Sequence, residues 1–248
     1  AGKIVSSIPA SAVTSLVIEG NDSNNTVTID AAAIPAGGLT YNGNGNGDFD
    51  VLNIRDSAGT VTKLTHDFVN AHDGSVTIDG KQVTYTGLEP ISDLETVVDR
   101  IFRFGATDDV VTLGDNGIAG DNRSQISSVS SSESVDFINP SGSATVDLGD
   151  GDNTLKISAK DIAFVAPLKV LAGTGDDSLV AATGDLNLSG VSLEKLGGNW
   201  QISSRFVGTS FTTSGDYQLT LAGGGQLNAS QTFGKSGGGM FGDQTSDT

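Results

Sequence analysis

The sequence contains no cysteine, one tryptophan, one methionine and five prolines. The absence of cysteine excludes disulfides, thiolate metal ligands and a cysteine nucleophile. A transmembrane helix needs about 20 consecutive, mainly apolar residues. No such run is present, so we expect no membrane span. The GxSxG elbow, the HExxH pair and the P-loop, which mark common enzyme classes, are missing as well.

Glutamate is scarce, although the chain is strongly acidic. The net charge is −17, and only five of the 30 acidic residues are glutamate, which leaves 25 aspartates. Aspartate is favoured in turns, whereas glutamate is favoured on helix surfaces. The composition therefore predicts acidic turns, whose oxygens suit a hard cation such as Ca²⁺. The same charge excludes nucleic acid as a partner, because the phosphates would repel the protein.

The second half of the chain repeats one pattern: an apolar strand, a glycine-rich turn and another short strand. The turns begin at Gly149, Gly173, Gly197 and Gly223, with spacings of 24, 24 and 26 residues. A further apolar patch follows in three units, at 162–165, 186–188 and 206–207, and reads as a third strand. Three short strands in about 24 residues match one coil of a parallel β-helix, whose strands stack about 4.8 Å apart. We therefore expect an all-β fold, a β-solenoid with coils of about 24 residues.

The first half carries weaker copies of this pattern, with turn glycines at 20, 45 and 105. "GSVTIDGKQVTYTG" (74–87) predicts an inserted β-hairpin, since Asp79-Gly80 can form a two-residue turn with positive φ. "SDLETVVDRIF" (92–102) predicts a short helix, because a serine cap is followed three residues later by glutamate. Residues 127–134 read as a serine-rich loop or a weak strand. We expect an irregular part (1–125), regular coils (126–235) and a flexible glycine-rich tail (236–248).

The turn "AGTGDDSLV" (172–180) fits the nonapeptide G-G-x-G-x-D-x-U-x except at its first glycine. "LGDGDNTLK" (148–156) fits it with Asn153 in place of the aspartate. The chain here resembles the haemolysin-type (RTX-like) calcium-binding repeats of large bacterial exported proteins, and "VTYTGLEPI" (83–91) looks like modules of very large bacterial surface proteins. This resemblance implies Ca²⁺ in the acidic turns. The candidate metal ligands are Asp150, Asp152, Asp176, Asp177, Asp108 and Asp109.

A structural explanation of the same turns stays open. Glycine supplies positive φ, and aspartate or asparagine can satisfy turn amides through its side chain. "GGN" at Gly197 and "AGGG" at Gly223 keep the turn without the acids. Histidines 66 and 72 flank "DFVNAHD", where we interpret both as loop residues rather than as a metal or acid–base site.

Three functional classes are alternatives to a structural role. A polysaccharide-degrading β-helix enzyme would need a basic residue beside bound Ca²⁺, and the arginines 55, 100, 103, 123 and 205 follow no carboxylate cluster on a repeated strand. Ice binding would need Thr-x-Thr motifs at the coil spacing, which 26–28, 60–62 and 84–86 do not keep. A carbohydrate-binding adhesin would expose aromatic residues, for which Trp200, Tyr217, Phe206 and Phe211 are the candidates.

A non-catalytic structural role remains the main expectation. A solenoid has open ends that must be capped or joined to another strand. The sequence has no polar capping helix at either end and opens with "AGKIVSS", so we expect a processed chain or a segment of a longer one. We expect an extracellular or cell-surface building block, calcium-stabilised, that associates with copies of itself or with flanking segments of a longer chain.

Overall fold

The structure is a computed structural model that describes most of the chain. The described residues are 9–44, 49–55, 59, 61–158, 160–181, 186–187, 191–195, 198–202, 205–213, 217–221, 226–233 and 240–243. They form two large β-sheets and two short 3₁₀ helices, η1 (Ala10–Ala12) and η2 (Ala31–Ala33). The predicted all-β class is confirmed.

We name the two sheets I and II. Sheet I contains, in spatial order, β1 (Leu16–Glu19), β3 (Leu39–Asn42), β7 (Lys81–Thr86), β6 (Gly74–Ile78), β5 (Val61–Phe68), β9 (Val97–Arg103), β13 (Ser143–Asp147), β15 (Leu168–Ala172), β18 (Val191–Lys195), β20 (Arg205–Thr213) and β17 (Leu186–Asn187), with β22 (Gln226–Phe233) also paired to β20. Sheet II contains β2 (Thr26–Asp30), β4 (Val51–Arg55), β8 (Ile91–Asp93), β12 (Ser132–Ile138), β11 (Arg123–Ser128), β10 (Val110–Asp115), β14 (Thr154–Ile157), β16 (Asp176–Ala181), β19 (Gly198–Ile202), β21 (Tyr217–Leu221) and β23 (Met240–Asp243).

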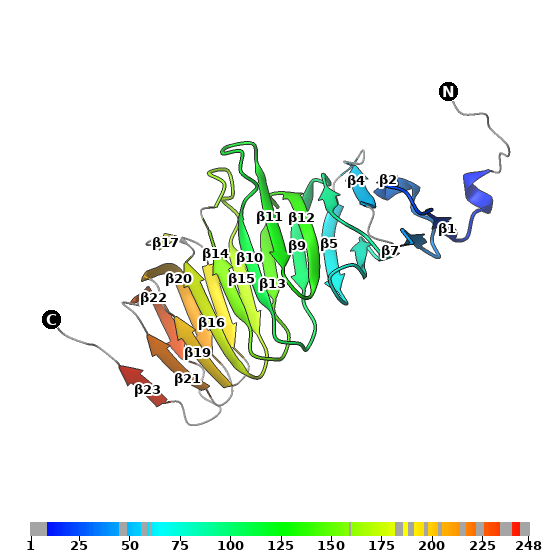
Figure 1. The fold of residues 1–248 in the computed structure, drawn as a ribbon. Coiled ribbons are helices and arrows are strands. Elements are labelled where there is room, and N and C mark those ends of the chain that lie inside the picture. The colour runs from blue at the N-terminus through cyan, green and yellow to red at the C-terminus, as the bar shows by residue number, and fades with distance from the viewer. Residues whose placement is uncertain are drawn as a thin grey trace.

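The strands stack along one direction, with β1 and β2 at one end and β21 and β23 at the other (Figure 1). Most neighbours pair in parallel, and antiparallel pairs occur at β5–β6–β7 and at β10–β11–β12. Both sheets are therefore mixed. From β13 to β16 the chain alternates between the sheets, so that β13 pairs with β15 in sheet I and β14 pairs with β16 in sheet II.

One hydrophobic core lies between the two sheets. Along the strands buried and exposed side chains alternate, as the period of two residues in a β-strand requires. The buried side chains of both sheets form a single cluster that runs from Ile29 to Leu179. This cluster includes the apolar residues of the strands on either side of the repeated turns, Val146, Val170, Leu155 and Leu179.

The 24-residue repeat is confirmed between the turns at Gly149 and Gly173. Val146 pairs with Val170 in sheet I, and Leu155 pairs with Leu179 in sheet II. The predicted third strand at 162–165 is wrong. The side chain of Asp161 accepts a hydrogen bond from the amide of Ala163, which makes a local turn and leaves Ile162 and Val165 exposed.

The remaining sequence predictions fall partly inside and partly outside the described residues. Leu186 and Phe206 do lie in paired strands, β17 and β20. The turns predicted at Gly45, Gly197 and Gly223 lie outside the described residues. Residues 127–134 form the end of β11, a turn and the start of β12, so both interpretations of this segment hold in part. Within the glycine-rich tail, residues 240–243 form β23.

The predicted hairpin is confirmed. β6 and β7 pair antiparallel, with Ile78 opposite Lys81. The turn residues Asp79 and Gly80 have φ of 45° and 86°. The hairpin is part of sheet I, where it connects β5 to β3.

The predicted helix over 92–102 is wrong, because the segment forms β8 and β9. β9 pairs with β5 on one side and with β13 on the other, so its backbone is hydrogen-bonded at both edges. Its β-branched residues Val97 and Val98 favour a strand. Sheet pairing therefore outweighs the local capping signal around Glu95. Within the described residues no helix is long or apolar enough to cross a bilayer.

Candidate metal centre

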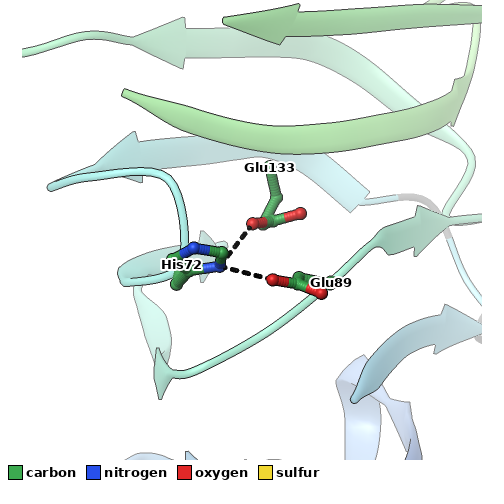
Figure 2. A group of neighbouring side chains, drawn as sticks. All are labelled: His72, Glu89 and Glu133. Atoms are coloured by element: carbon green, nitrogen blue, oxygen red, sulfur yellow. Dashed lines mark ion pairs between the residues drawn. The ribbon is translucent and has the colours of Figure 1, made fainter. Parts of the chain in front are cut away.

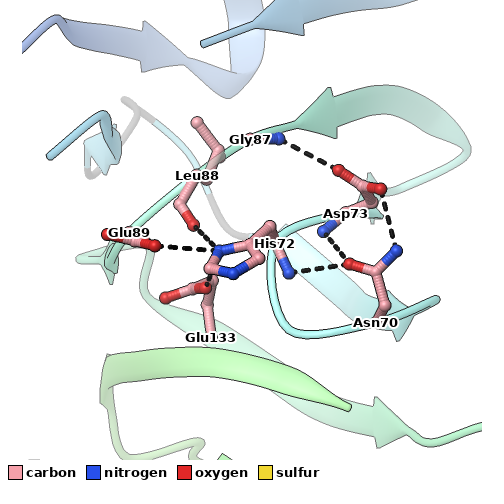
Figure 3. A network of polar contacts seen from close by, with 7 residues as sticks. All are labelled: Asn70, His72, Asp73, Gly87, Leu88, Glu89 and Glu133. Carbon is pink, nitrogen blue, oxygen red and sulfur yellow. Dashed lines mark hydrogen bonds and ion pairs between the residues drawn. The ribbon is translucent and has the colours of Figure 1, made fainter. Parts of the chain in front are cut away.

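The loop between β5 and β6 (residues 69–73) is folded around the side chain of Asn70. Its Oδ1 accepts hydrogen bonds from the amides of His72 (2.8 Å) and Asp73 (3.0 Å), and its Nδ2 donates to Asp73 Oδ2 (2.8 Å; Figure 3). Asp73 Oδ1 in turn accepts from the amide of Gly87 at 3.0 Å. The loop is thereby fixed to the segment that follows β7.

This loop directs the His72 ring toward two glutamates. Nδ1 of His72 lies 3.0 Å from Oε1 of Glu89 and 3.1 Å from Oε1 of Glu133 (Figure 2). The carbonyl oxygen of Leu88 lies 3.3 Å from the same nitrogen. Three oxygens thus surround one ring nitrogen that can hold a single proton.

The two glutamates are neighbours because of the register of sheet II. Ile91 pairs with Leu52 on one side and with Val135 on the other. The residues two places before Leu52, Ile91 and Val135, which are Asp50, Glu89 and Glu133, therefore stack as well. The residues two places before the paired positions Val27, Val111, Leu155 and Leu179 stack in the same way. We call this set the corner column; its members are Asn25, Asp50, Glu89 and Glu133 in one stretch and Asp109, Asn153 and Asp177 in the other.

The cluster is half open to solvent. The exposed side-chain fractions are 52% for His72, 33% for Glu89 and 10% for Glu133. Burial raises the pKa of Glu133 to about 7; the charge of His72 acts against this rise, and that of Glu89 adds to it. The buried phenol of Tyr85 is influenced by the same acidic side chains. Its pKa is raised, first by burial and then by the charges of Glu133, Asp73 and Asp67.

The donor set fits a metal ion. The ligand atoms of His72, Glu89 and Glu133 lie within 4.8 Å of one another, and in the described part of the chain this is the one group of three or more histidine and acidic side chains that does so. The sequence interpretation of His72 as a loop residue was correct but incomplete. Its two partners are 17 and 61 positions away in the sequence, so no local pattern indicated them.

The aspartates predicted as calcium ligands lie in stacked turns, as the repeat required. The amide of Asp152 donates to Oδ1 of Asp108, and the amide of Asp176 donates to Oδ1 of Asp152, both at 2.8 Å. We call Asp108, Asp152 and Asp176 the outer column. Asp150 Oδ1 accepts from the amide and the hydroxyl of Thr174 at 2.8 and 2.9 Å.

The corner column bonds in the opposite direction. The amide of Asp109 donates to Oδ1 of Asn153 (3.0 Å), and the amide of Asn153 donates to Oδ1 of Asp177 (3.0 Å). Asn25 and Asp50 make the same bond at 2.6 Å. In both columns an aspartate or asparagine side chain therefore caps a backbone amide of the neighbouring turn. This is the structural role that the sequence left open, and calcium binding by these residues stays a prediction.

The turn glycines are required by close approach. A side chain at Gly149 would collide with the carbonyl oxygen of Gly105, and one at Gly173 would collide with the carbonyl oxygen of Gly149. Gly149, Gly151 and Gly175 also have positive φ, of 71°, 104° and 123°. Glycine is therefore needed here with or without a metal ion.

Asp109 is buried among serines. Its Oδ1 accepts hydrogen bonds from the hydroxyls of Ser128 and Ser130, both at 3.2 Å, and from Ser131. Its Oδ2 is buried and has no hydrogen-bond partner among the described atoms. The serine-rich segment thus solvates a carboxylate inside the protein.

The prediction of a loop residue is wrong for His66, the other histidine, which lies in β5 with its side chain in the core. Its Nε2 is 2.8 Å from Oδ2 of Asp93, and the same oxygen accepts from Nη1 of Arg100. Arg100 also donates from Nη2 to the carbonyl oxygen of Glu95 at 2.7 Å. All three side chains are fully buried. Burial lowers the pKa of His66, while the charge of Arg100 and the bond from His66 lower that of Asp93 against its burial.

The other arginines considered as catalytic bases are ion-paired where their side chains are described. Arg55 lies 3.6 Å from Asp30, Arg103 lies 2.5 Å from Asp67, and Arg123 lies 2.5 Å from Asp136. The structure does not describe the side chain of Arg205. The same holds for the four aromatic candidates for glycan binding, which are Trp200, Phe206, Phe211 and Tyr217. No family model, curated protein or solved structure matches the chain.

Proposed function

We propose that the chain is a non-catalytic β-solenoid building block of an extracellular or cell-surface structure. The observation that supports this is the in-register parallel stacking of turn on turn, which the two columns of side-chain caps extend along the molecule. A stack of this kind is a rod, because each turn contacts only its neighbours. Its repeats would be of the RTX-like type, with Ca²⁺ in the acidic turns of the outer column.

The end formed by β1 and β2 supports association with a further copy or with a flanking segment. Both strands are the first of their sheets in the described fold. Beside them lies a recess of about 330 Å³ lined by apolar side chains that include Leu16, Ile18 and Ile34. Val17 is 61% exposed. An exposed apolar edge favours the addition of another strand.

Backbone directions at this edge allow a sharp test. The amides of Leu16 and Gly20 donate to the carbonyl oxygens of Gly38 and Asn42, which lie on the inner side of β1. The amide of Val17 therefore points to the open side. Val17→Pro removes that donor while keeping the bonds between β1 and β3, and Val17→Thr is the matched control.

The experiment is electron microscopy of the purified chain in millimolar Ca²⁺ and after EGTA. We expect filaments or layers that disperse in EGTA, that fail to form with Val17→Pro and that persist with Val17→Thr. Assemblies indifferent to EGTA would remove calcium from the proposal. Isolated rods of the unmodified chain in both conditions would refute assembly.

A carbohydrate-binding adhesin is the second candidate, favoured by a polar groove of about 540 Å³ on sheet I. It is lined by Lys63, Thr65, Asp67, Thr77, Asp79 and Arg103. Glycan-array binding that is lost in Lys63→Glu and kept in Trp200→Ala combined with Tyr217→Ala would favour the groove. Binding lost only in the aromatic variant would favour the aromatic side chains, and no binding above background would remove this candidate.

A further inference from the structure

We propose that His72, Glu89 and Glu133 bind one divalent d-block ion of the Zn²⁺ class. The site differs from the predicted calcium turns in place and in chemistry, and it goes beyond the assembly role, since it depends on neither end of the rod. Its ligands come from the β5–β6 loop, from the segment before β8 and from β12.

The spacing of the donor atoms supports the assignment. Around a tetrahedral Zn²⁺ with bonds of about 2.0–2.1 Å, two ligand atoms lie about 3.3 Å apart. The distances from Nδ1 of His72 to the two carboxylate oxygens and to the Leu88 carbonyl oxygen are 3.0, 3.1 and 3.3 Å. Small shifts of the two glutamate side chains would open the space that the ion occupies. The exposed side of His72 leaves a position for water.

The chemistry of the donors selects the class of ion. Ca²⁺ takes six to eight oxygen ligands, whereas an imidazole nitrogen with two carboxylates is a ligand set that suits Zn²⁺. The ion would also balance charge, because two carboxylates and a carbonyl oxygen converge on one nitrogen. A single proton on Nδ1 can serve only part of that set.

The corner column gives an independent reason. At its other described positions the residue is aspartate or asparagine; Asp50, Asn153 and Asp177 each cap a neighbouring amide through Oδ1. At 89 and 133 the residue is glutamate, which is longer by one methylene and reaches His72 instead. The change of residue type occurs at the two positions that face the histidine.

The site is held in place before any ion binds. The side chain of Asn70 fixes the backbone of His72 (Figure 3). The amide of Leu88 also donates to the carbonyl oxygen of His72 at 3.0 Å. Such outer contacts orient a metal ligand and typically affect affinity by about 10–100-fold. Asn70 is therefore a positioning residue, and the bound ion would tie the loop to β12.

The test uses the full chain, ZnCl₂ and NMR of the histidine rings, because the chain has only two histidines. We expect one equivalent of Zn²⁺ to shift the ring signals of His72 and to leave those of buried His66 unchanged. Glu89→Gln and Glu133→Gln should each raise the dissociation constant for Zn²⁺ by at least about tenfold, and Asn70→Ala should raise it by about tenfold. Asp152→Asn, which removes a carboxylate from the outer column, is the control and should bind Zn²⁺ like the unmodified chain.

The same spectra separate misfolding from loss of the site. Unchanged His66 signals show that the core of a variant is intact, and Glu89→Gln, at the more exposed ligand, is the milder change. The proposal is overturned if His72 does not respond to one equivalent of Zn²⁺. It is equally overturned if folded Glu89→Gln and Glu133→Gln bind Zn²⁺ as tightly as the unmodified chain. Neither result would bear on assembly, which the microscopy tests separately.

Discussion

The backbone amide of Asp176 donates a 2.8 Å hydrogen bond to Oδ1 of Asp152, a residue 24 positions earlier. The bond joins two acidic turns that would otherwise only repel each other. It shows that a carboxylate in such a turn serves the backbone of its neighbour. The aspartate-rich composition thus has a structural reason as well as the predicted metal-binding one.

Replacing the buried Asn153 by alanine should lower the free energy of unfolding by about 1–3 kcal/mol, because the amide of Asp109 loses its acceptor inside the protein. Urea denaturation measures the change. Asn153→Asp keeps the acceptor but would place a buried carboxylate against the carbonyl oxygens of Asp150 and Gly151, so it is not a neutral control. A loss below about 0.5 kcal/mol for Asn153→Ala would contradict the capping role.

Calcium should raise the melting temperature of the unmodified chain more than that of Asp152→Asn combined with Asp176→Asn. Asparagine keeps the hydrogen-bond acceptors of the outer column and removes two ligand charges. At a concentration 100 times the dissociation constant, one bound ion would stabilise the protein by about 2.7 kcal/mol. Thermal melts with and without EGTA measure the difference. An equal rise in the melting temperature of both proteins would mean that calcium binds outside the outer column. No rise in either protein would mean that calcium does not bind the folded chain.

Arg100→Met should destabilise the protein by about 3–5 kcal/mol, because Asp93 would be left as a buried charge without its cationic partner. Adding Asp93→Asn to Arg100→Met should recover part of that loss. Chemical denaturation of the two single variants and the double variant forms a complete cycle. Additive losses would show that the two groups are not coupled.

The contribution of His66 to stability should fall as the pH falls below about 6.5, the ordinary pKa of histidine. The pKa of His66 is lowered in the folded protein, so the unfolded chain takes up that proton first. One such group gives a slope of up to about 1.4 kcal/mol per pH unit. Asp93, whose pKa is also lowered, adds loss at lower pH, as the pH drops from its unfolded toward its folded pKa.

Glu133 acts in the opposite sense and has to be removed from the comparison. Its folded pKa of about 7 lies above its ordinary value, so between about 7 and 4.5 the folded protein holds the extra proton and gains stability. The measurement is therefore made in a Glu133→Gln background, with and without His66→Gln. The glutamine keeps a donor to Asp93 and should flatten the slope between pH 6.5 and 5. An unchanged slope would contradict a neutral buried His66.

Local chemistry was enough to predict part of the fold. Asp79-Gly80 marked a hairpin because few residues tolerate positive φ, and Gly149 and Gly173 marked the repeat because stacked turns leave no room for a side chain. The segment after Ser92 was misread as a helix. Its strand depends on β5 and β13, which are far away in the sequence.

The candidate metal centre was beyond sequence reasoning for the same physical cause. Glu89 and Glu133 are brought together by the pairing of Ile91 with Val135, and His72 reaches them from a third segment. The buried position of His66 was also missed. Its neighbours in sequence are polar or charged as well as apolar, and its partners Asp93 and Arg100 come from β8 and β9.

The two columns of side-chain caps run in opposite directions along the stack. In the corner column the later turn supplies the acceptor, and in the outer column the earlier turn supplies it. Between the turns at Gly149 and Gly173, where the caps span 24 residues, an inserted 24-residue unit would therefore leave no amide uncapped. Duplication of residues 149–172 would add one turn, lengthen the stack of parallel strands by about 4.8 Å and leave both patterns of hydrogen bonds intact.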